Sequence, residues 1–343
     1  MKSLCFQGFF HIYPLGYLCY NKVMASNKPI IEYLTDYLDY LEIEKGLSSK
    51  TQENYSRFLH KFFSWLEAAN LSSLKPEKID DDHVWKYRVF LSRHMDPKTR
   101  RTLKKTTQNY YLIALRSLLE FFADKKISSL SPTQVKLARD KDDKEIKFLT
   151  LEQIERLLLA PDLKTKQGLR DRALLEALFS TGLRVAELVA LNRDQLKIRN
   201  SAEEIEVAVV GKGNKVRSVY FSERAVRWLK SYLDKRADMD PALFINYKPG
   251  IEKSGKSRRL TTQSVENIVK KYVVIAGLPV MATPHTIRHS FATDLLAQGV
   301  DLRLVQEFLG HRNIATTQIY THVTNKQLKD IHKKIHNGGR LKE

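Results

Sequence analysis

Residues 205–221, IEVAVVGKGNKVRSVYF, interrupt a chain of 343 residues whose apolar pattern is otherwise helical. Apolar residues here alternate with other residues on both sides of a Gly-Lys-Gly-Asn segment, as is typical of a β-hairpin. The alternating positions are Val207, Val209, Val216, Val219 and Phe221. The stretch therefore predicts two short antiparallel strands with Lys212 at the bend.

Toward the N-terminus, apolar residues recur at helical spacing. Residues 30–41 carry one apolar stripe, and Ser49 with Gln52 forms the pattern of a capping box that opens a second helix. Further helices are expected over about 81–93 and 106–123. This first domain is therefore predicted to be all helical.

The C-terminal half is also expected to be mainly helical, apart from the hairpin. Thr150 is a possible N-cap for the first of its helices, and Gly and Pro residues separate the later ones. The remaining helices are expected over 171–180, just after Thr181, and over 265–276, 288–298 and 302–309. The fold class predicted is mainly α, with one small β-sheet.

The patterns divide the chain into two domains. A helical domain is expected over 28–125, a linker rich in Ser and alternating charges over 126–147, and a second domain over 148–325. Residues 1–27 match neither domain, and Met24 is a candidate for the true start. Residues 326–343 carry apolar positions at near-helical spacing and are expected to form a tail helix.

The charge of the chain indicates a polyanionic partner. Lys and Arg number 58 against 39 Asp and Glu, which gives a formal charge of +19. Nucleic acid is the first candidate, although a basic surface that serves only solubility, a ribosomal role or a membrane-surface role would give the same composition. A cluster in the predicted first domain suits phosphate contacts. Its cations are Arg93, Lys98, Arg100, Arg101, Lys104 and Lys105.

Cysteine usage and hydropathy limit the other classes. Both cysteines, Cys5 and Cys19, lie in the N-terminal stretch, so neither domain holds a disulfide or a cysteine metal site. This pattern fits a cytoplasmic protein. His11, Pro14 and Gly16 interrupt the apolar N-terminal stretch, which disfavours a signal peptide, and a membrane-spanning helix is not expected.

Taken singly, the polar motifs of the second domain are weak. Arg184 could simply pair with Glu187 one helical turn later. Lys212 lies between glycines, but the Walker spacing is absent. His285 and His289 keep open a zinc site, which would lack the usual acidic partners.

The order of these motifs is more specific. TGLRVAEL (181–188), VVGKGNKVR (209–217), TPHTIRHSFAT (283–293) and LGHRNIATTQIYTHV (309–323) together resemble the active site of the tyrosine recombinase and phage integrase family. The similarity is greatest to Xer-type site-specific recombinases, over about 150–332. Residues 29–125 resemble that family's helical, SAM-like core-binding domain in pattern only.

The resemblance implies a role for each matching residue. Arg184 and Arg288 would clamp the scissile phosphate, Lys212 would protonate the leaving 5′-oxygen, and Tyr320 would be the nucleophile. His285 would act as base and His311 would donate to a nonbridging oxygen, while Glu187 would orient Arg184 or His285. The product would be a 3′-phosphotyrosine, formed without metal or other cofactor.

The resemblance also implies the partners. Two domains would clamp double-stranded DNA, and a homo- or hetero-tetramer, with or without a second recombinase, would join two sites through a Holliday junction. The tail would dock on a neighbouring protomer. Chromosome dimer resolution is the expected role; integration of a mobile element, relaxation by a type IB topoisomerase, and noncatalytic architectural DNA binding are the alternatives.

Overall fold

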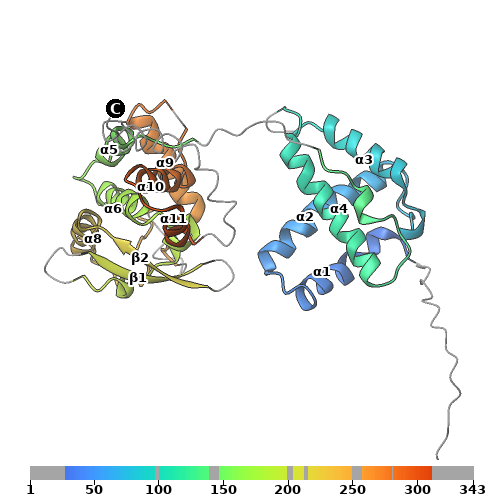
Figure 1. Ribbon diagram of the computed structural model, residues 1–343, viewed down its shortest axis with the longest axis horizontal. Coiled ribbons are helices and arrows are strands. Elements are labelled where there is room, and N and C mark those ends of the chain that lie inside the picture. The colour runs from blue at the N-terminus through green and yellow to red at the C-terminus, as the bar shows by residue number, and fades with distance from the viewer. Residues whose placement is uncertain are drawn as a thin grey trace, which may run out of the picture. The chain divides into compact units, whose positions relative to one another are not determined.

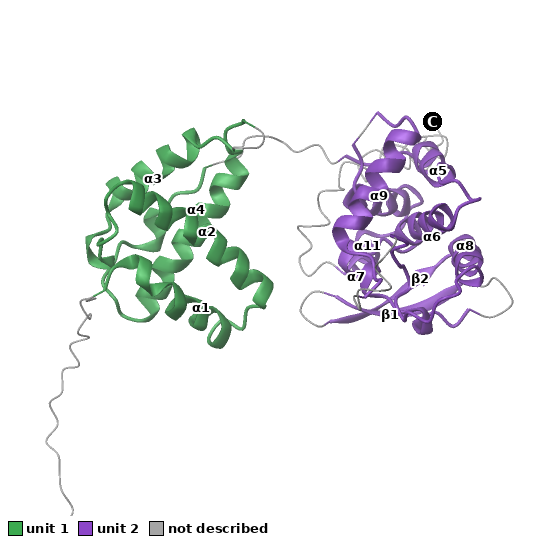
Figure 2. Ribbon diagram, turned by 180° about the vertical axis from the view of Figure 1, so that it is seen from behind, with its two compact units in different colours: residues 1–143 green, residues 144–343 purple. Residues whose placement is uncertain are grey.

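The computed structural model describes residues 28–96, 100–138, 147–198, 204–211, 215–248, 257–279 and 281–310. The chain divides into two compact units, residues 1–143 and 144–343 (Figures 1 and 2). His311 and Tyr320, Lys98 and Lys212, the N-terminal stretch and the expected tail helix lie outside the described residues. No helix in the described parts is long and apolar enough to span a membrane.

The first unit is helical, as its periodicity predicts. Its helices are α1 (Leu34–Ile43), α2 (Ser49–Ala68), α3 (Asp81–Arg93) and α4 (Lys105–Asp124), with 3-10 turns at Ile30–Tyr33, Pro76–Lys78 and Pro132–Gln134. α2 and α4 form the largest contact of the unit. Aromatic side chains such as Tyr37, Phe62, Tyr87 and Phe122 fill the core between them.

Two local expectations for this unit need correction. The N-cap position of α2 is Ser48 rather than Ser49, and its side chain makes no capping hydrogen bond. The Gln52 side-chain amide donates to the carbonyl of Leu47 at 2.9 Å, so no capping box forms. The expected linker begins too early, because Val135 is buried in the first core and Asn109 bonds the backbone of Ala138 in both directions. Local side-chain bonds and one apolar residue extend the unit beyond its last helix.

The second unit contains the predicted hairpin and seven helices among the residues described. The helices are α5 (Leu151–Leu159), α6 (Lys166–Thr181), α7 (Val185–Ala190), α8 (Glu223–Asp234), α9 (Thr262–Ile275), α10 (Pro284–Ala297) and α11 (Leu302–Leu309). Thr150 caps α5 through a complete capping box with Gln153. Sequence periodicity missed α8, although Ser222 caps it and Val226, Leu229 and Tyr232 form its buried face.

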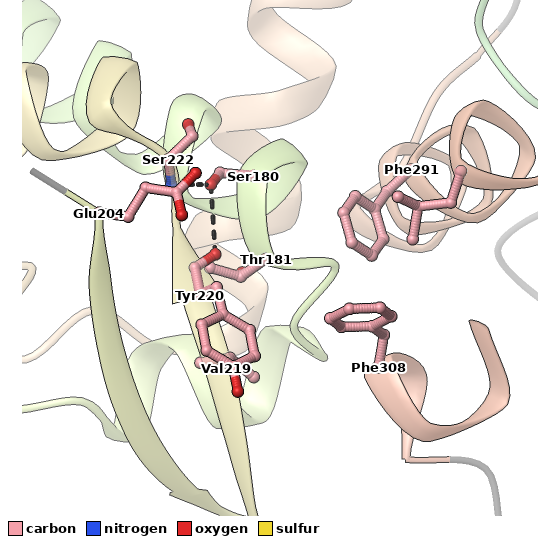
Figure 3. Close-up of a pocket in the computed structure, with 9 residues that line it drawn as sticks. Ser180, Thr181, Glu204, Val219, Tyr220, Ser222, Phe291 and Phe308 are labelled. Atoms are coloured by element: carbon pink, nitrogen blue, oxygen red, sulfur yellow. Dashed lines mark hydrogen bonds between the residues drawn. The ribbon is translucent and has the colours of Figure 1, made fainter. Parts of the chain in front are cut away.

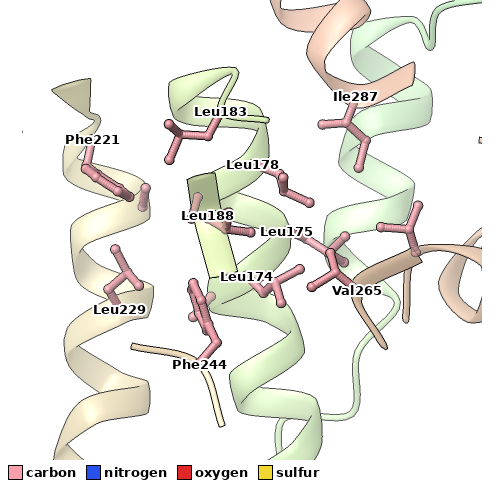
Figure 4. Close-up of a cluster of buried hydrophobic side chains, with 14 of the residues drawn as sticks. Leu174, Leu175, Leu178, Leu183, Leu188, Phe221, Leu229, Phe244, Val265 and Ile287 are labelled. Carbon is pink, nitrogen blue, oxygen red and sulfur yellow. The ribbon is translucent and has the colours of Figure 1, made fainter. Parts of the chain in front are cut away.

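α6 is the centre of this unit, with contacts to α5, α7, α8, α10 and β2. Leu174, Leu175 and Leu178 of α6 face side chains from α8, α9 and α10, such as Leu229, Val265 and Ile287 (Figure 4). A helix buried on nearly all sides fixes the ends of its neighbours. The connection that follows α6 is therefore held in place from several directions.

The hairpin pairs β1 (Ile205–Val210) with β2 (Val216–Phe221), and Gly211 donates to the carbonyl of Lys215 at 2.8 Å across the base of the bend. Val207 lies opposite Val219, and both are buried. Val216, expected on the same face, lies with Val210 on the exposed face because side chains alternate along a strand. The inward position near the bend is instead occupied by Arg217.

Candidate functional site

The connection between α6 and α7 presents Arg184. Gly182 is the C-cap of α6 and has a left-handed φ of +58°, and Arg184 is the N-cap of α7 two residues later. A glycine is needed here because a side chain in this conformation is strained. The Arg184 side chain is 29% exposed, so its guanidinium lies at the edge of the unit.

Arg184 is held by one carboxylate and one carbonyl. Its Nη1 donates to Oε1 of Glu187 at 2.9 Å, and its Nη2 donates to the carbonyl of Gly310 at 3.0 Å. The backbone N–H of Arg184 donates to the other oxygen of Glu187 at 2.9 Å. The sequence prediction of an Arg184–Glu187 pair is therefore correct, and the pair also reaches the end of α11.

Arg288 lies in α10, which begins at Pro284 rather than near residue 288. Thr283 and Thr286 form a capping box there, so His285 lies in the first turn. Arg288 is buried; its Nη1 donates to the carbonyl of Gly182 and its Nη2 to the carbonyl of Leu309, both at 2.5 Å. The guanidinium therefore ties the end of α6 to the end of α11.

The two guanidinium groups converge on the last turn of α11. Arg184 and Arg288 bond the carbonyls of Gly310 and Leu309, two consecutive residues. Gly310 ends α11 with a φ of +61°. His311 is the next residue in the sequence, and Tyr320 follows it. Two guanidiniums at the end of one helix, Arg288 buried and Arg184 partly exposed, suit an anion with several oxygens, such as a phosphate.

His285 lies on the same helix as Arg288 and is solvent-accessible. Partial desolvation, and then the charges of Arg288 and Arg184, lower the pKa of His285, although Glu266 acts in the opposite direction. Burial lowers the pKa of the neighbouring His289 as well, and the charges of His285 and Arg288 add to this. The neutral imidazole is therefore favoured, as a proton acceptor requires.

Glu187 is the most strongly perturbed carboxylate of the site. Burial alone would raise its pKa, but the hydrogen bonds and charges of Arg217 and Arg184 outweigh burial and lower the pKa to about 2. The carboxylate is therefore ionised at neutral pH. It is an acceptor for both arginines.

Sequence reasoning missed Arg217. Its Nη1 and Nη2 donate to the two oxygens of Glu187 at 2.9 and 2.7 Å, a bidentate pair. A detectable signal existed, because Arg217 has the same strand parity as the apolar Val219 and Phe221 and so had to face inward. A charge at such a position needs a buried partner.

The basic cluster of the first unit is exposed where it is described. Arg100, Arg101, Lys104 and Lys105 are exposed, and Arg100 has a left-handed φ of +53°. Met95 and Thr102 form an isolated antiparallel bridge that closes the loop. Phosphate contact by these residues stays a prediction.

A pocket in the second unit lies between β2 and the helices α6, α10 and α11. Ser180, Tyr220, Phe291 and Phe308 are among its lining residues (Figure 3), and Leu295 completes its apolar side. The rings of Tyr220 and Phe308 pack edge to face, with 6.2 Å between their centroids. Both residues also line an adjoining pocket with Leu304 and Glu307. We call the combined surface the β2–α11 groove.

The zinc alternative raised by His285 and His289 finds no support in the described residues. Within the ranges given above, no three or more His, Cys, Asp or Glu side chains lie together as a metal ion would require. The groups that converge on the end of α11 are cationic. They suit an anionic substrate rather than a cation.

Comparison with protein families gives two matches that together span most of the chain. Residues 147–327 match the model of the phage integrase family, and residues 34–126 match that of the phage integrase N-terminal SAM-like domain. The first match contains the Arg184, Arg288 and hairpin region described above.

Individual proteins resemble the chain over nearly its whole length. The tyrosine recombinase XerD of Listeria innocua is 36% identical over 307 residues, with 89% of this chain and 98% of that protein covered. XerD of Vibrio cholerae is 35% identical over 317 residues, with 92% and 99% covered. Among solved structures, the XerH site-specific recombinase bound to a palindromic difH substrate matches with a TM-score of 0.65 at 24% identity, over 87% of this chain and 83% of that chain.

Proposed function

The chain belongs to the phage integrase family and is a site-specific tyrosine recombinase, and we propose that it cuts and rejoins DNA through Tyr320 to resolve chromosome dimers. Similarity to proteins named XerD along almost their entire length supports the Xer-like role. The observation that carries the catalytic assignment is the convergence of Arg184 and Arg288 on the carbonyls of Gly310 and Leu309.

In the proposed reaction the two arginines exchange carbonyl oxygens for phosphate oxygens. A phosphodiester under attack gains negative charge on its nonbridging oxygens, and two preorganised guanidiniums stabilise that charge. Glu187 orients Arg184, and His311 donates a further hydrogen bond. The clamp needs no metal ion for charge stabilisation.

Four groups exchange bonds or protons in strand cleavage: the scissile phosphodiester and the side chains of Tyr320, His285 and Lys212. The phenolic oxygen of Tyr320 attacks phosphorus while the bond from phosphorus to the 5′-oxygen breaks, which leaves a 3′-phosphotyrosine. Neutral His285 takes the phenolic proton, and Lys212 gives a proton to the 5′-oxygen. The phosphotyrosine keeps the energy of the broken bond, so another 5′-hydroxyl can attack it and release Tyr320.

We propose the same domain assignment as for the family. Residues 28–125, together with the segment to Ala138 that is attached to the same core, would bind DNA through the basic cluster, Lys98, Arg100, Arg101, Lys104 and Lys105, and residues 148–325 would carry the chemistry. The partner would be double-stranded DNA, bound by four protomers on two sites. A second recombinase could supply two of the four.

The tail, residues 326–343, would link the protomers. Its apolar positions include Leu328, Ile331 and Ile335, and its charges are mostly lysines. The β2–α11 groove is lined by aromatic and aliphatic side chains and also by polar ones, among them Glu204, Glu307 and Arg217, whose charge is paired with Glu187. We propose that the groove of one protomer accepts the tail of its neighbour. The apolar positions of the tail suit the aromatic and aliphatic lining of the groove, and its lysines are opposite in charge to Glu204 and Glu307.

Recovery of the cleaved DNA tests this function. Full-length protein is incubated with fragmented chromosomal DNA of the source organism, denatured, and the protein-linked fragments are sequenced, with Tyr320→Phe as the control. One chromosomal site with an adduct on Tyr320 supports dimer resolution. Sites at the ends of a mobile element would support the integrase alternative, and absence of any adduct would refute the catalytic assignment.

A further inference from the structure

Arg217 is a nearly buried cation on a face that otherwise packs apolar side chains. It lies opposite Val209 in the hairpin, and its side chain is 13% exposed. Val219 and Phe221, the next two inward residues of β2, are buried. Burial of an arginine at such a position is unfavourable unless its charge is paired. The group that pairs with Arg217 therefore indicates what the residue does.

That partner is a carboxylate shared with the proposed phosphate clamp. Glu187 is 6% exposed and accepts two hydrogen bonds from Arg217 and two from Arg184. One carboxylate between two guanidiniums leaves a net charge of one positive unit. Without Arg217, Glu187 and Arg184 would form a neutral pair, and Arg184 would offer a phosphate much less attraction.

Arg217 also contacts the backbone beside two other proposed catalytic residues. A methyl group on Gly310 would lie 2.9–3.1 Å from Cδ, Nε and Cζ of Arg217, and one on Gly211 would lie 3.0 Å from its Nη1. Gly310 directly precedes His311, and Gly211 directly precedes Lys212. The guanidinium therefore packs against the base of the hairpin bend and against the end of α11.

We propose that Arg217 is a positioning residue for strand cleavage. Its guanidinium occupies Glu187, which keeps the charge of Arg184 available to the scissile phosphate and fixes its position relative to the hairpin bend and α11. This inference rests on the proposed role of Arg184 as a phosphate clamp. It adds a second positioning residue beside Glu187 to the roles implied by the motifs.

Variants that change the net charge around Glu187 distinguish this proposal from a purely structural role of Arg217. Arg217→Ala should reduce the rate of single-turnover cleavage by about 10²–10³-fold, as expected when one stabilising donor system is lost. Arg217→Ala combined with Glu187→Gln removes both charges, restores the net positive unit at Arg184, and should recover at least about tenfold of that loss. Arg217→Lys should lie between, because it keeps the charge without the bidentate fork.

The substrate supplies the second arm. A nicked suicide substrate, built on the site recovered above, carries either a normal phosphate or a methylphosphonate at the cleaved position. Methylphosphonate lacks one negative oxygen, so a defect caused by lost positive charge should shrink to within about tenfold of wild type. DNA binding measured by gel shift should be unchanged on both substrates.

A second shared carboxylate in the same unit gives the matched control. Glu176 accepts from both Arg172 and Arg224 away from the clamp, so Arg224→Ala removes one of two arginines from a shared carboxylate and should leave cleavage unchanged. Equal defects of Arg217→Ala on both substrates, without rescue by Glu187→Gln, would overturn the proposal. If Arg217→Ala fails to fold, Arg217→Lys and the double variant still decide it. Failure of the wild-type protein to form the Tyr320 adduct would instead refute the proposed function.

Discussion

Phe291 of α10 covers the backbone of Gly182 so closely that a methyl group there would lie 2.5 Å from its Cδ1 atom. Gly182 also has a φ of +58°, and its carbonyl accepts from Nη1 of Arg288. One glycine therefore ends α6, admits the aromatic ring and supplies an oxygen that holds a proposed catalytic arginine. Any side chain at this position must disturb all three.

Gly182→Ala should destabilise the second unit by about 2–4 kcal/mol, from left-handed strain and overpacking together. Gly277→Ala is the matched control, because Gly277 has a φ of +60° but only an ordinary contact at 3.4 Å. It should cost about 1–2 kcal/mol from strain alone. Urea unfolding, monitored by hydrogen exchange of the α6 amides, measures the change in the free energy of unfolding for both variants. Equal losses would show that Phe291 yields without cost.

Cleavage by the wild-type protein should keep its rate as the pH falls from neutrality to 6.5, the ordinary pKa of histidine, and decline only below it. The reason is that burial and the nearby arginines lower the pKa of His285, so its neutral, proton-accepting form persists to lower pH. Rates under kcat/KM conditions between about pH 5 and pH 8 report this pKa in the free protein.

His285→Gln should abolish the decline in rate at low pH together with most of the activity. The pKa of His289 is lowered in the same way, but His289→Gln should retain the decline. A decline that depends on His289 would move the base to that residue. A decline that begins above pH 6.5 would contradict the lowered pKa of His285.

Lys212→Ala should slow cleavage of normal DNA by about 10²–10⁴-fold, the usual contribution of a general acid. On a substrate with sulfur in place of the 5′-bridging oxygen, the leaving group needs no proton, and the variant should approach the wild-type rate. Quantified adduct on a denaturing gel gives both rates. Lys215→Ala is the control on the same bend, and equal Lys212→Ala defects on both substrates would assign the acid elsewhere.

Deletion of residues 326–343 should leave binding to a single site intact and impair synapsis and cleavage, if the tail binds the neighbouring protomer. Leu304→Lys, on the proposed acceptor groove, should have the same effect, since Leu304 is 50% exposed and a lysine there would repel the basic tail. Met239→Lys, at an 85% exposed position elsewhere, is the control. Full recombination by the shortened chain would exclude tail docking.

Local sequence determined most of the elements. The range of α3, Asp81–Arg93, and that of α11, Leu302–Leu309, follow from apolar spacing and from the flanking Asp80 and Asp301 caps, which depend on neighbours within one or two turns. The hairpin and the pairing of Arg184 with Glu187 were predictable for the same reason. The four motifs that carry Arg184, Lys212, Arg288 and Tyr320 indicated the family, because they occur along the chain in that family's order.

Tertiary structure alone decided how the separated motifs meet. Arg184 and Arg288 converge because α6 and α10 pack together and both approach the end of α11, and no local pattern encodes that contact. Arg217 shows the division most clearly. Strand alternation in the sequence implied that its side chain faces inward, but only the tertiary structure, which brings Glu187 of α7 within hydrogen-bonding distance, identified its partner. A buried charge requires a counter-charge, and the fold, rather than the neighbouring residues, supplies it.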